Sequence, residues 1–187
     1  MATRTTKAKD VDEHINGTPE VKTEVVQEIE QPLNLEQQVT VKNIAGWTTV
    51  FARMLTVGDV TIPKGGSIRL SRNEIISQIH NNNKLFCGID NFGSHATLII
   101  KDQPTLDEVG FSNADQFNDS VVKELFAIAK QDEFEKELMK RIVTRAEKYA
   151  LMISIVKQKI NDFSKIRFCE NYTGYKIDKV ENEENSR

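Results

Sequence analysis

The chain has 187 residues, 39% of them hydrophobic and 28% charged, and its formal net charge is −3 at pH 7. This length suits one domain with appended segments, and the slightly acidic balance gives no basic field for sequence-independent binding of nucleic acid. No apolar run approaches the roughly 20 residues that span a bilayer, and no apolar core follows the basic N-terminus, so we expect neither a membrane span nor a secretion signal.

Residues 1–36 differ in composition from the rest of the chain, because the first aromatic residue is Trp47. Acidic residues dominate after position 9, and Pro19 and Pro32 interrupt any regular element. Such a segment buries too little apolar surface to offset its ordering entropy. We therefore expect a disordered acidic arm in the isolated protein, which is either a solvated tail or an arm that becomes ordered on a partner.

Residues 37–104 carry the signals of a small β-rich domain. Alternating and β-branched residues predict strands in "QQVTVKNI" and "WTTVFARML". The stretch "VGDVTIPKGGSIRL" predicts two more strands, joined by a turn at its proline and glycine pair. Ser71 and Glu74 have the spacing of a capping box, which predicts a short amphipathic helix that ends at the asparagine run after it. Strands in "KLFCGI" and "HATLIIKD" complete a sheet or partly open barrel.

Residues 105–165 predict a helical region with two helices, the second of which starts near Asp132, a capping residue. This second helix would have roughly 30 residues and a length of about 45 Å at 1.5 Å per residue. Its apolar positions recur every three or four residues and are Phe134, Leu138, Ile142, Ala146, Tyr149, Ile153, Val156, Ile160 and Phe163. Residues 166–187 are expected to form a short hairpin and a polar tail. The predicted fold class is therefore α+β, with a small sheet or partly open barrel, one short helix and a long C-terminal helical segment.

The long predicted helix has a consequence for assembly, because it extends beyond what the small sheet can cover. The helix before it, with its apolar stripe near residues 122–129, is too short to shield the remainder. An uncovered stripe of this length is larger than monomers usually expose. We therefore expect it to pack on another subunit or a different protein. The expected contact residues are Leu138, Ile142, Tyr149, Ile153, Val156 and Ile160, together with Trp47 and Phe51 in the β-rich region.

The segment "FCGIDNFGSHATLII", residues 86–100, brings Cys87, Asp90 and His95 close together in sequence. A zinc site needs three or four ligands at recognisable spacing, and the segment has no CxxC or HxxxH pattern. A cysteine nucleophile needs an imidazole within reach, whereas Cys87 lies in a predicted buried strand, where a thiol behaves as a small hydrophobe. The two cysteines of the chain also form no disulfide framework, and they favour a reducing cytoplasm during synthesis. We interpret the segment as a turn between strands.

This interpretation assigns no catalytic residue, no metal and no cofactor to the segment. Asp90, Asn91 and Gly93 are residue types that favour turns. Phe92 at the tip of the turn and His95 at the start of the next strand are then candidate contact residues for a partner.

The run from Val39 to Asp102 resembles a segment of the structural proteins of tailed-bacteriophage virions. The resemblance rests on an Asn and a Gly-Trp pair early in the run, then "GDVTIPKGGSIRL", a short helix and "FCGIDNFGSHA". It covers about a third of the chain and implies a non-enzymatic protein of the capsid or the head–tail junction. The expected partners are other virion proteins and the protein itself, as a homo-oligomer. The expected location is the virion, after synthesis in the host bacterial cytoplasm.

Two other functions stay open. A cytoplasmic regulatory or nucleic-acid-associated module would need a basic face, for which Arg53, Lys64, Arg69 and Arg72 lie near one another in sequence. An enzyme with dispersed active-site residues ranks last, because no nucleophile–base spacing is visible. We expect no membrane contact and no direct contact with nucleic acid.

Overall fold

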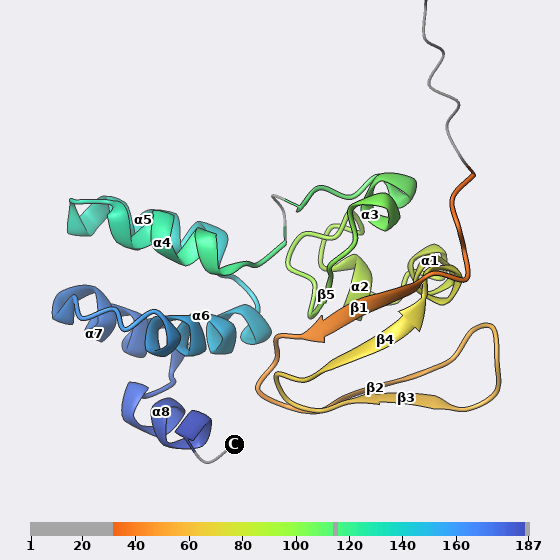
Figure 1. The fold of residues 1–187 in the computed structure, drawn as a ribbon. Helices are drawn as coiled ribbons and strands as arrows, with labels where there is room; N and C mark the ends of the chain where they lie inside the picture. Colours follow the sequence, from red (N-terminus) through yellow and green to blue (C-terminus); the bar gives the residue numbers. More distant parts are fainter. Residues whose placement is uncertain (1–31, 114–115, 186–187) are drawn as a thin grey trace, which may run out of the picture. The chain divides into compact units, whose positions relative to one another are not determined.

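The computed structural model describes residues 32–113 and 116–185 as an α+β fold, with two small antiparallel sheets followed by helices (Figure 1). The predicted fold class is confirmed, and the strands form open sheets rather than a barrel. Residues 1–31, most of the predicted arm, lie outside the described residues. The end of that predicted arm belongs to the folded unit. Arg72 Nη1 donates to Asn34 O at 2.5 Å, and Asn73 N donates to Leu35 O at 2.9 Å.

Five strands make up the two sheets. Their bounds are β1 Gln38–Asn43, β2 Thr49–Ala52, β3 Asp59–Ile62, β4 Ser67–Ser71 and β5 Leu98–Ile100. The larger sheet has the order β4-β1-β5, and the smaller one is the β2–β3 hairpin. In β1, Val39 and Val41 are buried while Gln38 is exposed, which confirms the predicted alternation.

Asn43, the last residue of β1, joins the two sheets. Its side chain is fully buried, and Nδ2 donates to the main-chain oxygens of Trp47 at 2.8 Å, Pro63 at 3.1 Å and Ile62 at 3.2 Å. Its Oδ1 accepts from Ala45 N at 2.9 Å. One amide side chain therefore bonds several main-chain groups at the base of the hairpin.

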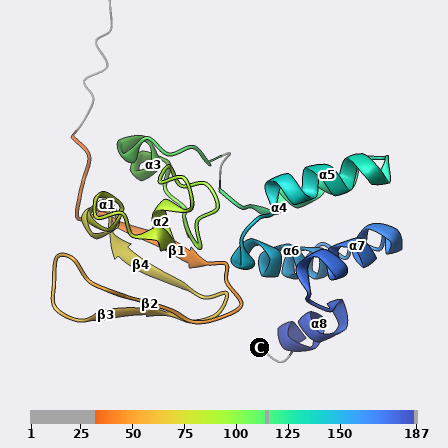
Figure 2. The same ribbon diagram turned by 180° about the vertical axis from the view of Figure 1, so that it is seen from behind.

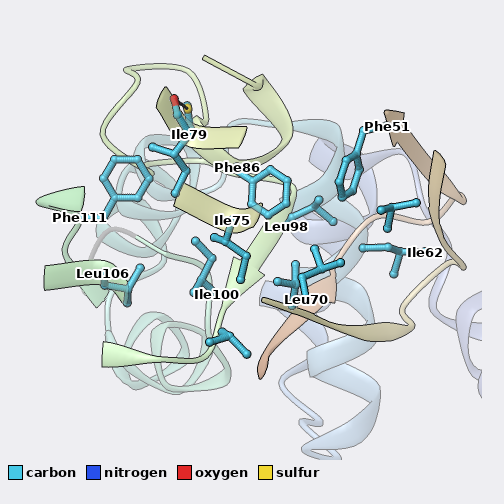
Figure 3. Packing of buried hydrophobic residues seen from close by; sticks show 14 residues of the cluster. Phe51, Ile62, Leu70, Ile75, Ile79, Phe86, Leu98, Ile100, Leu106 and Phe111 are labelled. Atoms are coloured by element: carbon cyan, nitrogen blue, oxygen red, sulfur yellow. Dashed lines mark hydrogen bonds between the residues drawn. The ribbon is translucent and has the colours of Figure 1, made fainter. Parts of the chain in front are cut away.

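The sheets pack against the helices that accompany them, α1 Arg72–His80, α2 Lys84–Cys87 and α3 Gln103–Val109. Figure 3 shows the resulting core, in which Phe51 of β2 meets Phe86 of α2 edge to face with ring centroids 5.3 Å apart. Leu106 of α3 and Phe111 belong to the same core. The first core therefore extends past the predicted boundary at residue 104. Asp102 caps α3 by accepting from Thr105 N at 3.0 Å, and this helix completes the first core.

The strand predicted in "KLFCGI" is wrong, because these residues form the short helix α2 and the turn after it. The side chain of Asn83 accepts a hydrogen bond from Leu85 N at 3.1 Å and so caps α2 at its start. Gly88, with φ 69°, ends the helix. Phe86 and Cys87 are nevertheless buried, as the apolar pattern predicts.

The start of α1 follows the prediction only in part. Ser71 Oγ accepts from Glu74 N at 3.2 Å, as expected for the cap of a helix. The carboxylate of Glu74 does not complete the box, because it instead accepts from the main-chain N–H groups of Met54 and Leu55. Glu74 thus connects α1 to the loop between β2 and β3.

The long second helix of the prediction is wrong, because the chain forms several shorter helices. Their bounds are α4 Asp119–Ala127, α5 Gln131–Arg141, α6 Arg145–Lys157, α7 Phe163–Thr173 and α8 Ile177–Asn185. Thr144 and Glu147 form a capping box that starts α6. Asp162 caps α7 by accepting from Lys165 N at 3.2 Å. The predicted C-terminal hairpin is also wrong, since Gly174, with φ 77°, joins two helices there.

Because the apolar stripe is divided among α5, α6 and α7, these helices fold back and cover its first part, whereas Phe163 at its end stays 76% exposed. Phe134, Leu138 and Ile142 have no exposed surface, and α6 contacts α4, α7 and α8 (Figures 1 and 2). The expectation that another subunit must cover this stripe rested on one continuous helix and loses that basis. No helix in residues 32–113 and 116–185 combines the length and the apolar character that crossing a membrane requires.

Candidate functional site

The loop after α2 has the turn chemistry that its residues predict. Asp90 Oδ1 accepts from Phe92 N at 2.8 Å and from Ser94 N at 3.2 Å. Partial burial of Asp90 disfavours its ionised form, but hydrogen bonds from Ser94 and from Phe92 N outweigh this, so the pKa of the carboxyl lies below its ordinary value. At Gly88 only glycine fits, because a Cβ there would lie 1.8 Å from Ser94 O. Asp90 therefore organises the loop.

Cys87, Asp90 and His95 have separate partners. Cys87 Sγ lies 3.4 Å from Ile79 O, and burial raises the pKa of this thiol. Burial also raises the pKa of Cys169, to about 12. Within residues 32–113 and 116–185, no three His, Cys, Asp or Glu side chains gather in a way that could hold a metal ion. The geometry of the loop therefore offers neither a thiolate nor a ligand set.

His95 instead pairs with Glu147, which is 52 positions later in the sequence. His95 Nδ1 lies 2.7 Å from Glu147 Oε1, and Glu147 is only 2% exposed. The other oxygen, Oε2, accepts from Val143 N and Thr144 N at 2.9 Å and from Thr144 Oγ1 at 3.0 Å. His95 has φ 61°, a left-handed conformation that is uncommon outside glycine. The capping box of α6 therefore also fixes the orientation of the imidazole.

A cavity of about 450 Å³ adjoins the His95–Glu147 pair. Its remaining walls come from the segment before α4, from α4 and from the end of α5. No spacing in the sequence relates His95 to Glu147 or to these helices. His95 could therefore be singled out from its own segment, whereas Glu147 and the cavity depend on the fold.

The loop between β2 and β3, residues Arg53–Gly58, is a second feature, and we call it the hairpin tip. Three of the four residues at positions 54–57 are apolar and exposed. Met54 is 45% exposed, Leu55 is 47% exposed and Val57 is fully exposed. Isolated apolar residues are common on protein surfaces, and neighbouring ones at the end of a hairpin make a candidate contact surface.

Hydrogen bonds hold the main chain of the hairpin tip in place. Met54 N and Leu55 N donate to the two oxygens of Glu74 at 2.8 and 3.1 Å. Gln78 Nε2 donates to Ala52 O at 2.7 Å, and Arg53 N donates to Gly58 O at 2.9 Å. Because the side chains of the tip do not take part in these bonds, they extend outward from a fixed main chain.

The predicted contact residues are distributed over different environments. Phe51, Leu138, Ile142 and Tyr149 are buried in the chain's own cores, so they offer no surface to a partner. The residues that are only partly buried, and that pack against the helical core, are Ile153, Val156 and Ile160. Trp47 is 37% exposed and lies beneath the Arg145 guanidinium, and Phe92 is 66% exposed.

Some of the basic residues considered for a nucleic-acid surface make contacts within the fold. Arg72 is 5% exposed, and its Nη2 lies 2.9 Å from Asp102 Oδ2. Lys64 Nζ lies 4.9 Å from the centre of the Tyr149 ring. Two of the four basic residues are thus engaged within the fold.

Comparison with known proteins finds no match to this chain among family models, curated proteins or solved structures.

Proposed function

We propose that this chain is a non-enzymatic structural protein that acts through protein–protein assembly, with the hairpin tip as its main contact surface. The observation that carries the proposal is the combination of exposed apolar side chains at Met54, Leu55 and Val57 with a main chain fixed by Glu74. A fixed loop loses little conformational entropy on binding, so apolar burial contributes more fully to affinity.

The setting we propose is the virion of a tailed bacteriophage, at the capsid or the head–tail junction. Its support is the resemblance of residues 39–102 to virion structural proteins, and this stretch contains the hairpin tip. The proposed partners are other virion proteins and further copies of this chain. The protein would be made in the host bacterial cytoplasm and end in the particle.

The alternative, a cytoplasmic regulatory or nucleic-acid-associated module, has less support. Phosphate binding depends on clustered Lys and Arg, and Arg72 is instead buried against Asp102. An enzymatic role has less support again, because the His95–Glu147 pair belongs to a capping box and Cys87 has a raised pKa.

The test replaces the three apolar side chains together, as Met54→Ser, Leu55→Ser and Val57→Ser. Since none of these side chains contributes to a core, we expect the variant to stay folded and to associate at least about tenfold more weakly. Light scattering of the purified protein and mass spectrometry of purified particles measure association and incorporation.

The control pair is Met139→Ser and Val143→Ser, two apolar residues of similar exposure, 45% and 43%, in the helical region. This variant should associate like the wild type. Unchanged association of the triple variant, or an equal loss in the control, would contradict a specific role of the hairpin tip.

A further inference from the structure

Gln116, which lies just before α4, has a buried and unpaired side chain. The residue is 3% exposed, and neither Oε1 nor Nε2 has a hydrogen-bond partner among the residues that the structure describes. Its main chain is held, since Gln116 N donates to Asn113 O and Asn118 Nδ2 donates to Gln116 O, both at 3.3 Å. Buried amides almost always have partners. An unpaired amide on a fixed main chain therefore points to a ligand.

Gln116 lines the cavity of about 450 Å³ beside His95 and also a second cavity of about 240 Å³ near β1 and β5. The volume of the first lies within the range of roughly 300–1,000 Å³ that is usual for ligand sites. The amide atoms themselves are buried behind the cavity wall, so we infer that a change of rotamer would bring them to a molecule in the cavity. His95 and Asn118 are further polar groups in the wall.

The cavity wall carries charged groups of both signs, and some of them form ion pairs with neighbours. Arg141 lies 2.9 Å from Glu124 and 3.5 Å from Glu137, and Glu147 is bonded to His95. An anionic ligand would meet the carboxylates of Glu124 and Glu147, and a cationic ligand would meet Lys140 and Arg141. The wall therefore favours a neutral ligand with hydrogen-bonding groups.

We propose that this cavity binds a short, extended segment of polypeptide through the amide groups of its main chain. A main-chain amide presents one N–H donor and one C=O acceptor, and Gln116 offers the acceptor and the donors that pair with them. A nucleotide fits less well, because its phosphate would lie among the carboxylates. This second site is separate from the hairpin tip and does not depend on it.

The experiment titrates the full chain, labelled with ¹⁵N, with the neutral peptide N-acetyl-Gly-Ala-Gly-amide. We expect a saturable shift of the side-chain amide signals of Gln116, which are identified by their disappearance in Gln116→Met. The Met variant keeps the length of the side chain but removes both polar groups. We expect this variant to bind the peptide about tenfold more weakly or worse. We also expect its melting temperature to be no lower than that of the wild type, because the substitution removes a buried amide that has no hydrogen-bond partner in the described part of the chain.

Thr49→Val is the matched control, because Thr49 Oγ1 is also buried without a hydrogen-bond partner in the part of the chain described, and Thr49 does not line the cavity. It should bind the peptide like the wild type. The absence of a saturable shift at millimolar peptide, or equal binding by Gln116→Met, overturns the proposal. So does a titration in which uridine monophosphate moves the Gln116 signals and the peptide does not.

The hairpin-tip variant separates this proposal from the proposed function. With Met54, Leu55 and Val57 replaced, the peptide titration should be unchanged even where association is lost. If the variant loses peptide binding together with association, the cavity is not independent of the hairpin tip.

Discussion

The Glu74 carboxylate, in the first turn of α1, accepts a hydrogen bond from the main-chain N–H of Met54 at 2.8 Å. Gln78, one turn later, donates to the same oxygen at 2.9 Å and to Ala52 O at 2.7 Å. One face of α1 therefore holds the end of the β2–β3 hairpin through polar contacts. Glu74 is 2% exposed, and its charge is stabilised by these donors rather than by water.

This contact predicts a dependence of stability on pH. Burial disfavours ionisation of Glu74, but hydrogen bonds from Gln78, Met54 and Leu55 outweigh it and hold the pKa below its ordinary 4.5. The stabilisation is therefore complete above pH 4.5 and is lost as the pH falls through the lower pKa of the folded state. We expect Glu74→Gln to be destabilised at pH 7 by about 2 kcal/mol, and to lose less stability than the wild type between pH 7 and pH 3.

Urea unfolding at the two pH values measures this difference. Glu108→Gln, at an exposed position of α3, is the control and should follow the wild type. An equal loss of stability in wild type and Glu74→Gln would show that another carboxyl causes the acid sensitivity.

Two adjacent residues after α5 test whether the apolar stripe is internal. Ile142 has no exposed surface, whereas Val143 is 43% exposed. Ile142→Ala should lower the free energy of unfolding by about 2–5 kcal/mol, because it leaves a cavity. Val143→Ala should change it by about 0.5 kcal/mol or less. Equal effects in urea unfolding would show that the chain does not turn inward at this point.

The His95–Glu147 contact predicts coupling between two parts of the sequence that are far apart. We expect His95→Gln and Glu147→Gln to show an interaction free energy of about 0.5–3 kcal/mol in a double-mutant cycle. His80, which is exposed at the end of α1, replaces His95 in a control cycle that should give no coupling. Unfolding free energies that simply add in the His95 cycle would show that the contact contributes nothing to stability.

The two thiols should be slow to react in the folded protein. Burial raises the pKa of Cys87, and it raises the pKa of Cys169 to about 12, so little thiolate exists at pH 8. We expect iodoacetamide to modify both cysteines within minutes in concentrated urea, and neither over the same time without it. Mass spectrometry counts the added groups. Rapid modification of Cys87 in the native protein would mean that the loop after α2 opens readily.

Local patterns predicted the β-rich part best. Val39 and Val41 are buried in β1 as their alternation predicts, and Ser71 caps α1 as expected. The long helix was a wrong prediction because the apolar period continues through both breaks and so conceals them. The signal for one break was present in the sequence, as Thr144 and Glu147 have the spacing of a capping box. Periodicity alone does not separate one helix from several in succession.

The candidate sites could be predicted only where neighbouring residues form them. Asp90 organises its own loop, and its turn chemistry is visible in the sequence. The partners of His95 and of the hairpin tip come from residues 52 and about 20 positions away, and no sequence spacing specifies such pairs. Exposure also depends on the fold, which is why Ile142 and Tyr149 were expected on the surface and lie inside.

Glu74 binds Met54 and Leu55 through their main-chain N–H groups, which every residue except proline possesses. Positions 54 and 55 can therefore change their side chains without losing the support of α1. A scaffold of this kind lets recognition diverge while the architecture is retained, much as variable loops do on a constant framework. Selection would then act on Glu74 and Gln78 to preserve a shape, and on the tip to follow its partner.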